Sequence, residues 1–125
     1  MFTWFKLLET FCPCDRHRLV YGFDHSKGLD SFHKADGPSR EKSAGKVSKG
    51  WKTSAKKLRA LVELHNNDAM LPGVTRCILV EGDVMDTIPR FVKDNPGLRI
   101  SLLHLDADLY LPTKVALEHF YPLVP

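Results

Sequence analysis

The sequence contains no long apolar run, no recognisable leader segment and no low-complexity stretch. No segment approaches the roughly 18 apolar residues that a membrane-spanning helix needs. The first residues include an acid and no small-residue cleavage site, which argues against a secretory signal peptide. We therefore expect a cytoplasmic protein that makes no membrane contact.

Cysteine is also scarce. The three cysteines, Cys12, Cys14 and Cys77, cannot form an even disulfide framework. The Cys12-Pro13-Cys14 pair lacks the second pair of ligands that a structural zinc site requires. We expect reduced thiols.

The composition is that of one globular domain spanning residues 1–125, with 43% hydrophobic and 26% charged residues. The net charge of +3 hides an asymmetry, because nine Lys or Arg and two acids between residues 34 and 59 give that segment +7 and leave −4 for the rest. We call residues 29–66, a polar loop followed by a helix, the basic insert. Such a segment is either a solvated loop and helix face or a surface that gathers an anionic sugar nucleotide or a nucleic acid.

Short apolar segments that end in acids alternate with helical patterns. Helices are predicted at residues 2–11 and 51–66, then from a cap at Thr87 with Pro89 in the first turn, and finally from Pro112. The predicted strands are residues 16–24, 76–83 and 100–110, and the continuous apolar run of the last predicts a strand buried on both faces. This alternation predicts an α/β fold with three parallel strands, whose acidic ends meet at one edge of the sheet.

The last predicted strand carries two acids one residue apart. Period-two alternation would point Asp106 and Asp108 to the same side, where they could share a cation. The alternative is that one caps the next helix and the other is solvated. Asp24, at the end of the first strand, suits either the hydroxyls of a ribose or a helix N-cap.

Three motifs together resemble the macrocin O-methyltransferase family. They are Val20-Tyr-Gly-Phe-Asp24 with Gly28, Val80-Glu-Gly-Asp83 with Asp86-Thr-Ile-Pro89, and Leu103-His-Leu-Asp-Ala-Asp-Leu-Tyr110 with Pro112-Thr113 and Ala116-Leu-Glu118. The resemblance implies a Rossmann-like, S-adenosylmethionine-dependent O-methyltransferase that acts on a hydroxyl of a sugar or sugar nucleotide.

The same resemblance implies a role for each acid. Asp24 would accept the cofactor ribose hydroxyls and Asp83 would contact the adenine. Asp106 and Asp108 would hold a divalent metal, Mg²⁺, beside the acceptor hydroxyl, and Asp106 would be the catalytic carboxylate. A cation held by carboxylates lowers the pKa of a hydroxyl, and a nearby carboxylate takes its proton. The basic insert would be a lid over an anionic acceptor.

The sequence also departs from the family pattern. His25, Ser26 and Lys27 stand where relatives have an aromatic residue and an acid. No glycine-rich cofactor loop is present, so the resemblance implies a partial sheet that lacks its first and its C-terminal strands. We expect a fragment that is marginally stable or dependent on a partner, with a homo-oligomer as one option, and inactive alone. The rival interpretation is a non-enzymatic α/β module that binds an acidic partner or, less favoured, nucleic acid through the basic insert.

Overall fold

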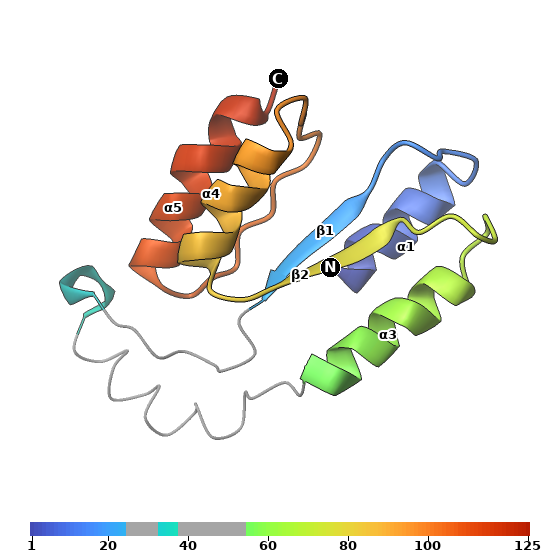
Figure 1. The fold of residues 1–125 in the computed structure, drawn as a ribbon, viewed down its shortest axis with the longest axis horizontal. Helices are drawn as coiled ribbons and strands as arrows, with labels where there is room; N and C mark the ends of the chain where they lie inside the picture. The colour runs from blue at the N-terminus through green and yellow to red at the C-terminus, as the bar shows by residue number, and fades with distance from the viewer. Residues whose placement is uncertain (25–32, 38–54) are drawn as a thin grey trace.

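A computed structural model describes residues 1–24, 33–37 and 55–125 of the chain, which form a mixed arrangement of helices and strands (Figure 1). The strands are β1 (Val20–Asp24) and β2 (Cys77–Glu81). The α-helices are α1 (Phe2–Phe11), α3 (Ala55–Asn67), α4 (Val84–Asp94) and α5 (Tyr110–Phe120), and the 3₁₀ turns are η1 (Lys34–Asp36) and η2 (Tyr121–Leu123).

The two strands pair in parallel, as the alternation of elements predicts. The register runs from Val20 opposite Cys77 to Asp24 opposite Glu81. At the two ends of the ladder, the Val20 N–H donates to the Arg76 carbonyl at 2.7 Å and the Gly82 N–H donates to the Asp24 carbonyl at 3.1 Å. Both strands are shorter than predicted, but their acidic ends lie at one edge of the sheet.

The prediction of a third strand is not borne out in the described residues, where the sheet has two strands. Residues 101–108 form no ladder, because among the described residues no backbone carbonyl accepts an N–H from this segment. The side chains still alternate, because Leu103 and Leu105 are half-buried while Leu102 and His104 are exposed. The prediction of a strand buried on both faces is therefore wrong, because Leu102 is 57% exposed and the segment has no hydrogen-bonded neighbour among the described residues, which a strand also needs.

Helices cover the two strands on both sides (Figure 1). On the α4 and α5 side the core is built around Ile88, Ala116 and Phe120, which are each at most 5% exposed. The ring of Phe23 from β1 lies 5.3 Å from that of Phe120. Leu103 of the unpaired segment packs against the same cluster. One apolar core thus supports both β1 and the unpaired segment.

The α1 and α3 side is held by polar contacts as well as packing. The fully buried ring of Phe5 lies under the Arg76 guanidinium at 5.9 Å. Arg76 is only 1% exposed and donates to the backbone carbonyls of Cys12 and Asp15. These contacts tie the turn after α1 to the start of β2, since a buried cation needs acceptors.

The side chain of Asn66, near the end of α3, forms hydrogen bonds with the backbone at the start of β2. Its Oδ1 accepts the N–H groups of Arg76 at 3.1 Å and Cys77 at 2.9 Å. Its Nδ2 donates to the Cys77 carbonyl at 2.8 Å. One side-chain amide thus satisfies three backbone groups that would otherwise need another partner.

Two helix starts differ from the sequence prediction. Helix α4 is capped by Asp83, whose Oδ1 accepts the Met85 N–H at 2.9 Å, so Thr87 is not the cap and Pro89 lies inside the helix beyond its first turn. Thr87 is instead 3% exposed, within the helix. Helix α5 begins at Tyr110, two residues before the predicted start.

The predicted loop at residues 29–50 and the first residues of the predicted helix at 51–66 fall largely outside the described residues. The described part contains η1 and the helix from Ala55. Within the described ranges no helix is long and apolar enough to cross a membrane.

Candidate functional site

The carboxyl ends of β1 and β2 form the first part of the candidate site. Asp24 is half-buried and lies opposite Glu81 in the register. The chain then turns at Gly82, which has a φ of +130°. A Cβ at this position would come within 2.9 Å of the Thr87 methyl carbon, so glycine is required for both conformation and space. The turn places Asp83 directly at the start of α4.

Asp83, the predicted adenine contact, has a structural role in the described residues. Its carboxylate caps α4 through the Met85 N–H, and its side chain is exposed. A cap uses one carboxylate oxygen and places negative charge at the positive end of the helix. Asp83, which was predicted only as a cofactor contact, is therefore the cap of α4 that was predicted at Thr87.

Glu81 is a site residue that sequence analysis missed. Its carboxylate accepts hydrogen bonds from Nε and Nη2 of Arg59, which projects from α3. The ion pair lowers the pKa of Glu81 and raises that of Arg59, chiefly through these hydrogen bonds. The available signal was a further acid near the end of the predicted strand, directly before Gly82, in a chain whose helix at 55–67 is basic.

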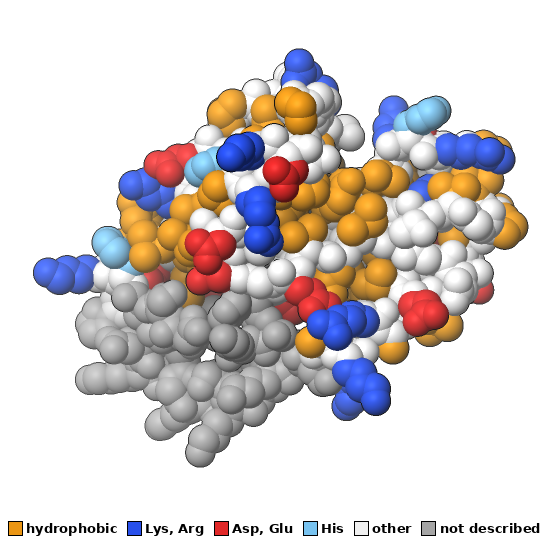
Figure 2. All heavy atoms as spheres, in the orientation of Figure 1, with side chains coloured by type: hydrophobic (Ala, Val, Ile, Leu, Met, Phe, Trp, Pro, Cys, Tyr) orange, Lys and Arg blue, Asp and Glu red, His pale blue; other side chains and the backbone are white. Residues whose placement is uncertain are grey.

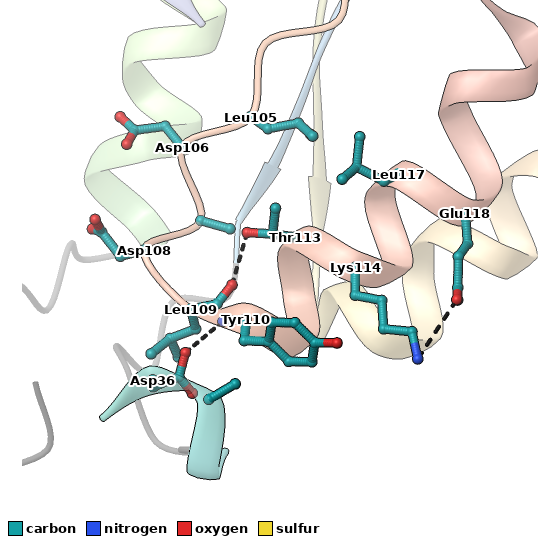
Figure 3. Close-up of a pocket in the computed structure, with 12 residues that line it drawn as sticks. Asp36, Leu105, Asp106, Asp108, Leu109, Tyr110, Thr113, Lys114, Leu117 and Glu118 are labelled. Carbon is teal, nitrogen blue, oxygen red and sulfur yellow. Dashed lines mark hydrogen bonds and ion pairs between the residues drawn. The ribbon is translucent and has the colours of Figure 1, made fainter. Parts of the chain in front are cut away.

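Asp106 and Asp108 project to the same side of the chain, away from α5 (Figure 3). Both are exposed. The segment turns at Asp108, which has a φ of +58°, and the Leu109 N–H donates to the Ala107 carbonyl at 2.7 Å. That hydrogen bond closes a three-residue turn of the γ type, a strained conformation for a residue with a Cβ.

The predicted metal site is present only in part. Two neighbouring carboxylates offer the hard oxygen ligands that Mg²⁺ favours. Among the described residues, however, no group of three or more His, Cys, Asp or Glu side chains could hold a metal ion. The donor set formed by Asp106 and Asp108 fits the carboxylate part of a magnesium site and does not complete one.

An open hollow of about 790 Å³ lies between the segment around Asp106 and Asp108, η1 and the first turns of α5. Tyr110, 44% exposed, contributes a ring to its lining. The ion pair of Lys114 and Glu118, at 3.7 Å, lies along its α5 side (Figure 3). The hollow therefore offers both an aromatic surface and hydrogen-bonding groups beside the predicted metal-binding acids.

The structure describes only some of the charged residues of the basic insert. Lys34, Lys56 and Lys57 are exposed, whereas Arg59 is paired with Glu81. Figure 2 shows acidic and basic side chains interspersed over the visible face of the described residues. Residues 38–54 lie outside the described ranges, so the predicted lid and nucleic-acid surface stay predictions.

The described residues thus form a parallel pair of strands between helices, with Asp24 and Glu81 at the carboxyl edge. No protein-family profile matches the sequence, and no curated protein matches it either. Among solved structures, the chain is similar to the crystal structure of CalS11, a calicheamicin methyltransferase, with a TM-score of 0.80 and 30% identity. It is also similar to the apo structure of CalS11, described as a TDP-rhamnose 3'-O-methyltransferase of calicheamicin biosynthesis, with a TM-score of 0.71 and 28% identity.

Both matches cover 98% of this chain but only 48% and 45% of the CalS11 chains. The chain thus spans about half the length of the enzyme it resembles. The comparison supports the predicted sugar O-methyltransferase fold, and the narrower assignment to the macrocin family stays a prediction.

Proposed function

We propose that the chain forms part of an S-adenosylmethionine-dependent O-methyltransferase that acts on a hydroxyl of a sugar or sugar nucleotide. The observation that carries the proposal is the parallel pair β1 and β2, with Asp24 and Glu81 opposite each other at the carboxyl edge. Ligands of open α/β sheets bind at that edge. The similarity to CalS11 over nearly the whole chain supports the same function.

We assign Asp24 to the ribose of the cofactor, because two carboxylate oxygens match two neighbouring hydroxyl donors. We assign Asp83 to the adenine side, where it would act with the backbone beside it, since its side chain also caps α4. The macrocin-type resemblance implies both roles.

The acceptor would approach Asp106 and Asp108. When bound, S-adenosylmethionine would supply the methyl group for the acceptor oxygen, and its sulfur would keep the electron pair of the broken carbon–sulfur bond. The hydroxyl proton goes to a carboxylate, for which we propose Asp106. A divalent cation bound by Asp106 and Asp108 would lower the pKa of the acceptor hydroxyl.

Calorimetric titration of S-adenosylhomocysteine, with and without Mg²⁺, tests this proposal on the protein as it stands. We expect binding that weakens about tenfold or more in Asp24→Ala, because hydrogen bonds to a charged group are lost. Asp94→Asn, a charge-neutralising change at an exposed residue at the end of α4, is the matched control. No heat from folded protein, or equal affinities in the two variants, would overturn the cofactor assignment.

A further inference from the structure

The segment 33–37 contacts the beginning of α5, although the two are far apart in the sequence. The Tyr110 N–H donates to Oδ1 of Asp36 at 2.6 Å, across a separation of 74 residues. The ring of His33 stacks on the Tyr110 ring, with centroids 5.1 Å apart and planes 26° apart. Figure 3 shows the Asp36 carboxylate directed at the backbone of the chain where α5 begins.

Asp36 supplies a cap that α5 lacks. The N-cap residue of α5 is Leu109, which has no side-chain acceptor for the N–H groups of the first turn. The Asp36 carboxylate also suits this position electrostatically, because negative charge is favourable at a helix N-terminus. Asp36, from a distant part of the sequence, therefore caps α5 in place of a side chain at the N-cap position.

The orientation of Asp36 is itself fixed by its own turn. Its second oxygen, Oδ2, accepts the His33 N–H at 2.7 Å, while Nδ1 of His33 accepts the Ala35 N–H at 3.1 Å. This reciprocal pair is a capping box on η1. Each carboxylate oxygen of Asp36 thus has a backbone partner, one within η1 and one at the start of α5.

The contact lies immediately after the strained turn that carries the acid pair. Tyr110 follows Asp108 by two residues, and Asp108 has its positive φ of +58°. Strained backbone persists only where the surrounding structure holds it in place. On one side of this turn, Leu105 packs into the core. On the other side, Leu109 is 5% exposed and Tyr110 is held by Asp36.

We propose that Asp36 is a positioning residue for Asp106 and Asp108, acting through the Tyr110 N–H to hold the turn at Asp108. The inference rests on the proposed function, because that function gives the acid pair its role. The segment 33–37 would thereby help to set the geometry of the acceptor side.

Amide hydrogen exchange and the H(N)–H(α) coupling of Asp108, both measured by NMR on the whole chain, test the proposal. In Asp36→Ala we expect the Tyr110 and Leu109 amides to exchange about five to ten times faster, as the loss of a helix cap implies. We also expect the Asp108 coupling to change. Asp36→Asn keeps an acceptor oxygen and should fall between Asp36→Ala and the unsubstituted chain, and Asp94→Asn should change none of these values.

Two results would overturn the proposal. One is that Asp36→Ala behaves like Asp94→Asn at both amides. The other is faster exchange at Tyr110 alone, with the Asp108 coupling unchanged, which would make Asp36 a helix cap without influence on the acid pair. Failure of the proposed function has a separate signature, because the unsubstituted chain would then bind no S-adenosylhomocysteine while these NMR differences could still be measured.

Discussion

The segment that contains β2 and the segment at residues 100–108 have similar sequences and different structures. Both are apolar, both end in acids and both were predicted to be strands. Residues 77–81 pair with β1 and are joined to α3 by Asn66. Residues 101–108 pack on the same core through Leu103 and Leu105 but have no ladder among the described residues.

The difference shows that burial and pairing are separate requirements for a strand. Alternating apolar residues are sufficient to bury one face of an extended segment, since that depends only on packing. The hydrogen-bonded ladder needs a neighbour on the correct edge, and burial does not supply it.

Removing part of the apolar core should destabilise both the paired strands and residues 100–108, because both pack on that core. Phe120→Ala takes away a ring that is 5% exposed and lies 5.3 Å from Phe23 of β1. We expect a loss of about 3 to 5 kcal/mol in the free energy of unfolding, measured by denaturant titration. Tyr121→Ala, an aromatic deletion at a residue that is 67% exposed, should have little effect. Similar losses in the two variants would contradict the assignment of the core.

Hydrogen exchange should separate the two regions directly. The amides of Val20 and Gly82, which donate to backbone carbonyls at the ends of the ladder, should be protected about a hundredfold more than those of Leu103 and Leu105. The rates are read by NMR in the unsubstituted chain. Equal protection would mean that residues 101–108 have a hydrogen-bonded neighbour in solution.

Removing the side-chain amide of Asn66 should lower the stability of the fold more than removing that of its neighbour on the same helix. Asn66→Ala leaves the N–H groups of Arg76 and Cys77 without their acceptor, and we expect a loss of about 2 kcal/mol in the free energy of unfolding. Asn67→Ala, one residue further along α3 and exposed, is the control. If the two variants lose the same stability, the link from α3 to β2 contributes nothing.

The smallest effect concerns pH. Arg59 lowers the pKa of Glu81 below its usual value of 4.5, so the contribution of the pair to stability is present above that value. It is lost as the pH falls through the lowered pKa, because Glu81 then becomes protonated. The difference in melting temperature between the unsubstituted chain and Glu81→Gln should therefore shrink below pH 4.5.

Local patterns predicted much of the fold. The helix at 2–11 is confirmed, and the helix at 55–67 ends one residue after the predicted end at 66. The parallel relation of the first two strands and their common acidic edge are also confirmed. These features depend on hydrophobic period and on chain-order alternation, which a sequence carries directly.

The candidate site was predicted less completely. Asp106 and Asp108 point to the same side as predicted (Figure 3), but the turn at Asp108, with its φ of +58°, is not the regular strand that the prediction assumed. The pairing of Glu81 with Arg59 and the contact of Asp36 with Tyr110 connect residues separated by 22 and 74 positions, respectively. No local pattern signals contacts of that range. The roles of Asp24, Asp83, Asp106 and Asp108 stay predictions that the binding experiments address.

Local sequence patterns specify which segments are helical, which segments are apolar and where the acids lie along the chain. Folding in three dimensions selects which apolar segments pair as strands, which acid caps α4 and which residue caps α5. The physical reason is that side-chain period is a local property, whereas a hydrogen bond between distant residues exists only once the chain has folded.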